Sequence, residues 1–134
     1  MQEISWLGAI AGTILSFVLG GFWYSKAAFG HAWAKHSGLS EDQIASANPR
    51  NMILVSLPLI LVSALVFAAF LGEAALGLSA AAGFAAGLFW VGASFGVNYV
   101  FEQKSMTLWF INAGYHTAQF TLIGLCIGLA NTYL

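Results

Sequence analysis

The chain has 134 residues, of which 60% are hydrophobic and only 7% are charged: four Lys or Arg and five Asp or Glu. An ordinary soluble domain has about 25% charged residues, so this composition excludes a water-soluble globule, and the 15% aromatic content excludes a disordered chain. The formal net charge of -1 excludes the broad basic surface that binds nucleic acid. The class that remains is an all-α integral membrane protein, with the lipid bilayer as its first partner.

Four stretches are long and apolar enough to cross a bilayer as helices. A hydrocarbon core of about 30 Å needs about 20 helical residues, and the chain offers residues 4–24, 50–71, 76–101 and 105–132. These stretches lack the alternation that is typical of barrel strands. We therefore predict one four-helix transmembrane domain over residues 1–134.

The connection at residues 25–49 is the one long loop of this arrangement, and it predicts a short helix lying in the membrane interface. Phe29 and Trp33 are four residues apart, and so are His31 and Lys35. Residues at this spacing share a helix face, so we expect the two aromatic side chains to point toward lipid.

Two start signals for helices follow in the same loop. Ser40 and Gln43 have the spacing of a capping box, and Asn48 before Pro49 predicts an N-cap followed by the first residue of the second span.

All basic side chains are predicted to lie on one side of the membrane. Four connected helices alternate sides, so the long loop and the turn at residues 102–104 share a side, which holds Lys26, Lys35, Arg50 and Lys104. The other side carries Glu3 and Glu73 and no Lys or Arg. The excess of positive charge on cytoplasmic loops predicts the cytoplasmic (inner) membrane, with both termini on the non-cytoplasmic side.

Small residues recur every four positions on the first and third spans. They are Gly8, Gly12, Ser16 and Gly20 on the first and Gly83 and Gly87 on the third. Such faces let two helix backbones approach closely in lipid. One small bundle offers few internal faces for them, so we predict a homo-oligomer that uses these faces.

The candidate site is predicted from polar residues within the spans, because placing a polar side chain in lipid costs free energy. On the fourth span, Asn112, His116 and Gln119 share a face, flanked by Tyr115. On the third span, the regular helical period places Gly87, Trp90, Ser94 and Asn98 in one stripe.

A hairpin folded about Gln103 would set residue 90 opposite 116 and residue 94 opposite 112. This juxtaposition predicts a polar pocket near mid-depth in which His116 relays protons or binds a ligand. The alternative interpretation is that the same groups only hydrogen-bond across helices and fix their register.

Catalytic and metal sites are not expected. The sequence has no nucleophile–base arrangement of the kind found in catalytic sites, no phosphate-binding loop and no CxxC motif. His31 and His36 are two local ligands where a metal ion needs three or four. We therefore predict a non-enzyme without a metal or cofactor.

Two parts of the sequence are distinctive. The first is Phe22-Trp23-Tyr24-Ser25, followed by Phe29-Gly30, Trp33 and Gly38-Leu39-Ser40, and the second is Asn112-Ala113-Gly114-Tyr115-His116 near the end. With these motifs the chain resembles a family of small bacterial four-helix membrane proteins known as domain of unknown function 1761. Lys26 departs from the proline that the resemblance implies at that position. The resemblance implies the fold and the inner membrane, and it implies no activity.

Two functions follow as hypotheses. The first is a membrane protein that binds or passes a small molecule, lipid or ion through a pocket formed by Trp90, Ser94, Asn98, Asn112, Tyr115, His116 and Gln119. The second is a non-catalytic scaffold that docks a protein partner through residues 25–49, with the interfacial residues Trp23, Tyr24, Phe29, His31, Trp33, Lys35 and His36.

Overall fold

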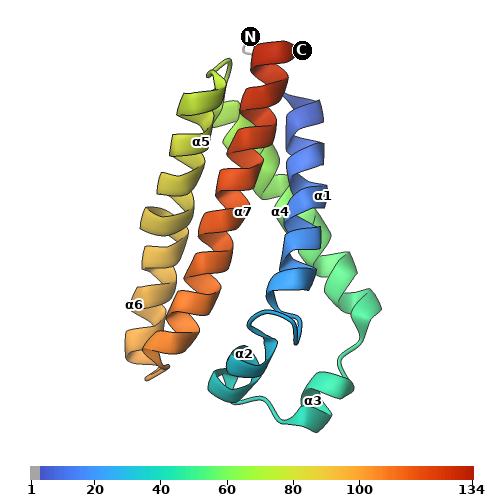
Figure 1. The fold of residues 1–134 in the computed structure, drawn as a ribbon, viewed down its shortest axis with the longest axis vertical. Helices are drawn as coiled ribbons and strands as arrows, with labels where there is room; N and C mark the ends of the chain where they lie inside the picture. The colour runs from blue at the N-terminus through green and yellow to red at the C-terminus, as the bar shows by residue number, and fades with distance from the viewer. Residues whose placement is uncertain (1–3) are drawn as a thin grey trace.

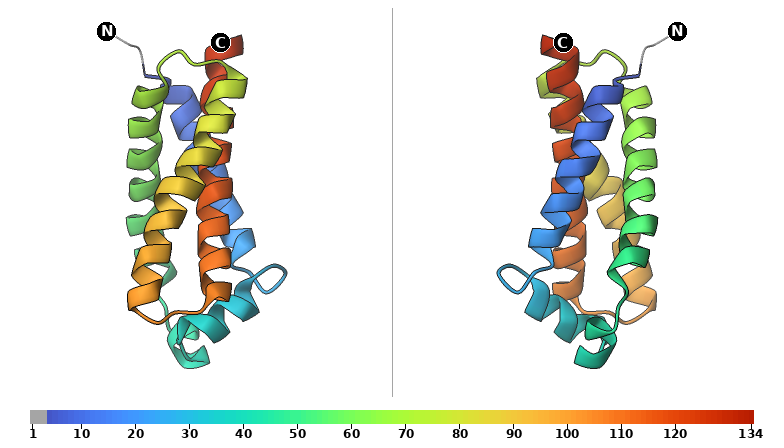
Figure 2. Two further views of the ribbon diagram at one scale, coloured as in Figure 1. Left: turned by 90° about the vertical axis from the view of Figure 1, so that its left-hand side faces the viewer. Right: turned by 90° about the vertical axis from the view of Figure 1, so that its right-hand side faces the viewer.

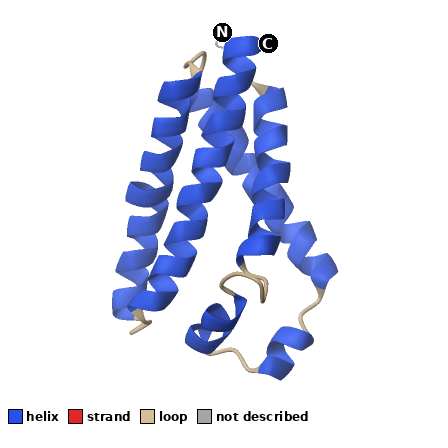
Figure 3. Cartoon of the chain, in the orientation of Figure 1, coloured by secondary structure: helices blue, strands red, loops and turns tan. Residues whose placement is uncertain are grey.

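The structure is a computed structural model that describes residues 4–134, and all of its regular elements are helices (Figures 1 and 3). In chain order they are α1 (Trp6–Trp23), α2 (Gly30–Ser37), α3 (Glu41–Ala45), α4 (Pro49–Leu71), α5 (Leu76–Ala85), the π-helix η1 (Ala86–Gly92), α6 (Ala93–Phe101) and α7 (Met106–Tyr133). Residues 4–134 contain no strand. The prediction of an all-α chain is confirmed.

Three of the helices are long and apolar enough to cross a membrane. They are α1, α4 and the continuous helix Leu76–Phe101, which joins α5, η1 and α6. The fourth predicted span corresponds to α7, which has 28 residues and carries the polar residues Asn112, His116 and Gln119.

The predicted helix starts of the long loop are confirmed. Ser40 Oγ accepts a hydrogen bond from the Gln43 backbone N–H at 3.1 Å, and Gln43 Oε1 accepts one from the Ser40 N–H at 2.8 Å, so the capping box is complete. Asn48 Oδ1 accepts from the Arg50 N–H at 3.0 Å, with Pro49 as the first residue of α4.

The short helix of this loop exists as α2, and the two aromatic side chains predicted to face lipid contact residues at the end of α1, while Phe29 stays 43% exposed. Phe29 packs on Trp23 with ring centroids 4.8 Å apart, and Trp33 packs edge-on against Tyr24 at 5.7 Å. Both rings therefore turn toward the end of α1. The spacing defined the aromatic side of the helix, but only the position of α2 against α7 decided where that side faces.

Helix α7 is the centre of the bundle. It lies between α1 and the α5–α6 helix, with α4 packed across it, and it also contacts α2 (Figures 1 and 2). The core between these helices is formed by small and branched side chains, among them Ala9, Ala64, Ala68, Ile123 and Ile127, all 0% exposed.

Glycines let the backbones of these helices touch. A methyl group on Gly8 would lie 2.6 Å from the Ile127 Cα, and one on Gly12 would lie 2.9 Å from the Ile123 Cα. On the other side of α7, a methyl on Gly83 would overlap the Phe120 carbonyl, and one on Gly87 would lie 2.5 Å from the His116 carbonyl oxygen.

The remaining members of the predicted small-residue face also pack within the chain. Ser16 is buried, and its hydroxyl lies 3.5 Å from the Gln119 carbonyl oxygen, while Gly20 lies against the Tyr115 ring. Both predicted faces are thus occupied by α7 of the same chain. Self-association stays a prediction, and it would have to use other surfaces.

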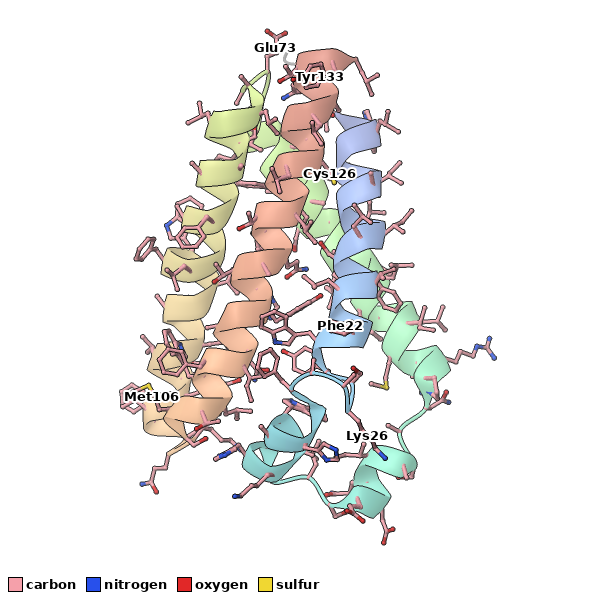
Figure 4. All side chains as sticks on the ribbon, in the orientation of Figure 1. Phe22, Lys26, Glu73, Met106, Cys126 and Tyr133 are labelled. Carbon is pink, nitrogen blue, oxygen red and sulfur yellow. The ribbon has the colours of Figure 1, made fainter. Side chains whose placement is uncertain are left out.

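The two ends of the bundle differ in charge. The start of α1 and the C-terminus lie at one end with Glu73, whereas Lys26 lies at the other end beside the loop helices (Figures 1 and 4). All four basic residues belong to that second end, which also carries three acids: Glu41, Asp42 and Glu102. Glu3, predicted on the opposite side, lies outside the described residues.

Candidate functional site

The helix Leu76–Phe101 changes register at η1, and this change decides which residues face α7. In η1 the Ala93 N–H donates to the Leu88 carbonyl, five residues back instead of four. A π-turn adds one residue relative to an α-helix, so every later residue is displaced by one position around the helix. The residues that follow Gly87 on the α7 side are therefore Gly92, Phe95 and Tyr99.

The predicted stripe through Trp90, Ser94 and Asn98 is consequently wrong. Trp90 is 66% exposed, and Ser94 and Asn98 are exposed as well. The Ser94 hydroxyl donates to the carbonyl of Trp90 in its own helix, at 2.7 Å. None of these three side chains joins Asn112 or His116, because the prediction assumed an unbroken period of 3.6 residues.

The residues Asn112, Tyr115, His116 and Gln119, here called the α7 polar stripe, lie on successive turns of α7. His116 Nδ1 lies 2.7 Å from Gln119 Oε1. The imidazole stacks on Phe95 with a centroid distance of 5.1 Å and an interplanar angle of 20°, and the Tyr115 ring meets its edge at 5.0 Å. The imidazole is thus held on three sides.

The fourth side of the imidazole is open. With the amide oxygen of Gln119 facing it, Nδ1 is the donor, so Nε2 of the neutral ring carries the lone pair. Within residues 4–134 the only hydrogen bond of the ring is the one through Nδ1. Every fully buried side-chain nitrogen or oxygen of those residues has a hydrogen-bond partner, so Nε2 is not fully buried, in keeping with the partial exposure of His116.

Asn112 links three helices. The Tyr24 hydroxyl at the end of α1 donates to Asn112 Oδ1 at 2.6 Å, and Asn112 Nδ2 donates to the Tyr99 hydroxyl of α6, also at 2.6 Å. This amide uses one acceptor and one donor on neighbouring helices, so it fixes α1 and α6 against α7. For Asn112, the interpretation as a hydrogen-bonded helix connector is supported.

Further hydrogen bonds hold the end of α1 in place. Trp23 Nε1 donates to the Ile111 carbonyl at 2.9 Å, and the Tyr115 hydroxyl donates to the Ser16 carbonyl at 3.0 Å. Trp23 and Tyr24, predicted as interfacial anchors, therefore belong to the wall of the α7 polar stripe.

The loop residues divide into two groups. His36 lies 2.8 Å through Nδ1 from Ser105 Oγ, the N-cap of α7, so it ties α2 to the start of that helix. His31 and Lys35 are exposed on the outer side of α2. The described residues contain no group of three or more His, Cys, Asp or Glu side chains that could hold a metal ion.

Phe95 and Tyr99 were missed in the sequence, although the glycines carried a signal for them. Gly83 and Gly87 are four residues apart, as are Gly92 and Gly96, but Gly87 and Gly92 are five apart. All four face α7. A face of small residues whose spacing widens from four to five is the pattern that a π-turn produces.

Helix α4 packs on α7 one turn beyond His116. Phe67 of α4 packs edge-on against Phe120 of α7 with centroids 5.6 Å apart, one turn beyond His116. Toward its N-terminus α4 crosses α1 and diverges from α7 (Figure 1), and its residues 49–56 are all exposed. The loop-side part of α4 is thus separated from α7, and the His116 side chain on α7 is partly exposed.

Two surface grooves lie elsewhere. One of about 560 Å³ runs along the opposite side of α7 and is lined by apolar residues and the methyl groups of Thr117 and Thr121, whose hydroxyls bond their own helix. The other, of about 360 Å³, lies between α1 and the end of α7 near Cys126. His116 lines neither of them.

Comparison with known proteins gave one family. The family model described as "Protein of unknown function (DUF1761)" matches residues 7–128, which include every residue of the α7 polar stripe and of its wall. Neither a curated protein nor a solved structure matches the chain.

Proposed function

The chain belongs to the DUF1761 family of proteins of unknown function, and on that premise we propose that it is a four-helix membrane protein that binds a small molecule at His116. The binding group is Nε2 of a neutral imidazole, presented at an open edge of the α7 polar stripe. The proposal extends to α7 as the fourth span and to the side of the membrane that each end of the bundle occupies.

The length and the hydrogen bonding of α7 support its role as a span. Its 28 residues extend over about 42 Å at about 1.5 Å per residue, more than a hydrocarbon core of about 30 Å requires. Its most polar side chains, Asn112 and Gln119, are hydrogen-bonded to neighbouring groups. Such pairing removes much of the cost of placing amides in lipid.

The location of the basic residues supports an orientation. The four Lys and Arg side chains collect at the loop end, which we assign to the cytoplasmic side of the inner membrane. The test is labelling of single cysteines by an impermeant reagent in a variant that lacks Cys126. Cysteine at position 73 should react from outside intact cells, and cysteine at position 104 only after permeabilisation; the reverse pattern would refute the orientation.

One observation carries the binding proposal: the imidazole of His116 has a partner on three sides, while its Nε2 has no hydrogen-bond partner among residues 4–134. A group held in one orientation without using its second nitrogen is preorganised to accept a hydrogen bond.

The substitution His116→Phe tests the binding proposal. Phenylalanine keeps a ring that stacks on Phe95 but removes both nitrogens. Native mass spectrometry of the protein in lipid nanodiscs should find a bound small molecule in the wild type that His116→Phe has lost. The matched control is His31→Phe on the exposed side of α2, which should retain the molecule. If both variants retain it equally, the proposed site is wrong.

A second function has support from the loop. The pairs Trp33–Tyr24 and His36–Ser105 hold α2 firmly against the bundle, while His31 and Lys35 project outward. A scaffold that docks a protein partner would use this side. A photo-cross-linker at position 31 should then capture the same protein repeatedly in cells, whereas one at the exposed position 90 should not.

A further inference from the structure

The turn that joins α1 to α2, here called the α1–α2 turn (residues 24–29), projects sideways from the bundle. Figure 2 shows it standing out beyond the neighbouring helices at the loop end, close to the level at which α6 ends and α7 begins. If the chain spans the membrane as proposed, this level is that of the lipid headgroups. The turn is therefore placed where headgroups and acyl chains meet.

Backbone hydrogen bonds hold the α1–α2 turn in one conformation. The Gly30 N–H donates to the Ser25 carbonyl at 2.9 Å, and a methyl on Gly30 would lie 2.7 Å from that carbonyl oxygen, so the chain returns closely on itself. The Phe29 N–H donates to the Trp23 carbonyl at 2.9 Å, and the Phe29 ring packs on that of Trp23. The turn is thus fixed to the end of α1 and preorganised for a partner.

The exposed side chains of this region combine a positive charge with apolar surface. Phe22 in the last turn of α1 is 60% exposed, and Phe29 is 43% exposed although one part of its ring packs on Trp23. Lys26 lies between them in the chain and is exposed. Such a combination suits the membrane interface, because the rings enter the acyl region while the long lysine side chain carries its charge to the phosphates.

The charge of this part of the chain favours an anionic lipid. Residues 4–40 contain two Lys side chains and no Asp or Glu. The three acids of the loop end lie on other segments, two in the first turn of α3 and one in the turn after α6. A lysine close to the membrane surface attracts anionic headgroups, so the group that complements Lys26 is the phosphate of such a lipid.

We propose that the α1–α2 turn binds the headgroup of an anionic phospholipid. Lys26 pairs with the phosphate, and the exposed parts of Phe22 and Phe29 lie against the acyl chains of the same leaflet. This inference rests on the membrane-spanning part of the proposed function and does not depend on a ligand at His116.

Native mass spectrometry of the full chain, released from nanodiscs of equal phosphatidylglycerol and phosphatidylcholine, tests the lipid preference. The wild type should retain phosphatidylglycerol preferentially, and Lys26→Gln should lower this preference about fivefold. The matched control is Lys35→Gln on the outer side of α2, which removes the same charge and should keep the preference. An equal loss in both variants would show attraction by total charge alone and overturn the proposal, as would a Lys26→Gln variant that keeps the wild-type preference.

The depth of the turn separates the failure of this proposal from the failure of the membrane span. Spin labels are attached in a variant that lacks Cys126, at Ala27→Cys in the turn, His31→Cys on α2 and Phe89→Cys on η1, where the native side chain is 65% exposed. Their contact with oxygen, which dissolves in lipid, and with a water-soluble nickel complex is measured in the same nanodiscs. Position 89 should meet mainly oxygen, position 31 mainly nickel, and position 27 both.

The two failures give different patterns of contact. If position 27 meets nickel as readily as position 31 while position 89 stays in lipid, the lipid-binding turn is wrong and the membrane span stands. If position 89 also meets mainly nickel, the membrane span fails, and the lipid-binding turn fails with it.

Discussion

The two halves of α7 are joined to their neighbours in different ways. Toward the termini the helices meet through backbone: a methyl on Gly124 would overlap the Ser79 carbonyl, and one on Gly128 would lie 2.7 Å from the Leu76 Cα. Toward the loop end they meet through side chains, with Asn112 between Tyr24 and Tyr99 and with Trp109 Nε1 donating to the Gly92 carbonyl at 2.8 Å.

The two halves of α7 therefore differ in their expected roles: one stabilises the bundle, and the other carries the candidate site. In the half toward the termini, here called the glycine half, close backbone contacts at Gly124 and Gly128 hold the bundle together. The half toward the loop also has a close backbone contact, between Gly87 and the His116 carbonyl, but it adds hydrogen bonds between side chains and contains the Nε2 of His116, which has no partner among residues 4–134. A ligand site is expected in the second half.

The largest expected effect comes from the glycine half. Gly124→Ala places a methyl group against the Ser79 carbonyl, and neither backbone can yield locally. We expect a loss of about 3 kcal/mol or more in the free energy of unfolding, measured by denaturation in detergent. Gly77→Ala is the control, because a methyl there meets nothing within 4 Å. Equal stability of the two variants would contradict the close backbone packing.

An intermediate effect is expected from the hydrogen-bonded half. Asn112→Leu removes the partner of the Tyr24 and Tyr99 hydroxyls, and we expect it to lower the free energy of unfolding by about 1–2 kcal/mol. Replacing both tyrosines by phenylalanine as well should add little, because the bonds are already lost. Asn98→Leu, at an exposed position on α6, should leave stability unchanged.

A pair of tryptophans tests the register set by η1. Trp109→Phe loses the hydrogen bond to the Gly92 carbonyl and should lower stability by about 1 kcal/mol. Trp90→Phe should have no measurable effect on the same unfolding curve, since the Trp90 ring is 66% exposed. If Trp90→Phe lowered stability more than Trp109→Phe, the result would contradict the register change at η1 and support a regular helix through residues 76–101.

The smallest effect on stability is expected at His116. Its single hydrogen bond to Gln119 lies within one helix, so His116→Phe should change the free energy of unfolding by less than about 0.6 kcal/mol. If the variant instead unfolds as readily as Asn112→Leu, His116 acts chiefly as a helix connector. That result would contradict the assignment of a ligand site to the loop-side half of α7.

Local signals in the sequence predicted much of the fold. The capping box of Ser40 and Gln43, the N-cap at Asn48 and the turn at residues 102–104 each depend on neighbouring residues, and each is found in the structure. The α7 polar stripe was predicted for the same reason, because residues three and four apart on one regular helix share a face.

Contacts between distant segments were predicted less well. The aromatic side of α2 was assigned to lipid, but it packs on Trp23 and Tyr24, because a pattern on one helix does not tell which neighbour its face will meet. The small-residue faces were correctly found, but α7 of the same chain occupies them.

By itself, the sequence determined that the chain is helical, where most of its helices begin and end, and which residues of α7 share one polar face. The tertiary structure decided that Phe95 and Tyr99, and not Trp90 and Ser94, stand beside that face. The physical reason is that one added residue in η1 rotates everything after it.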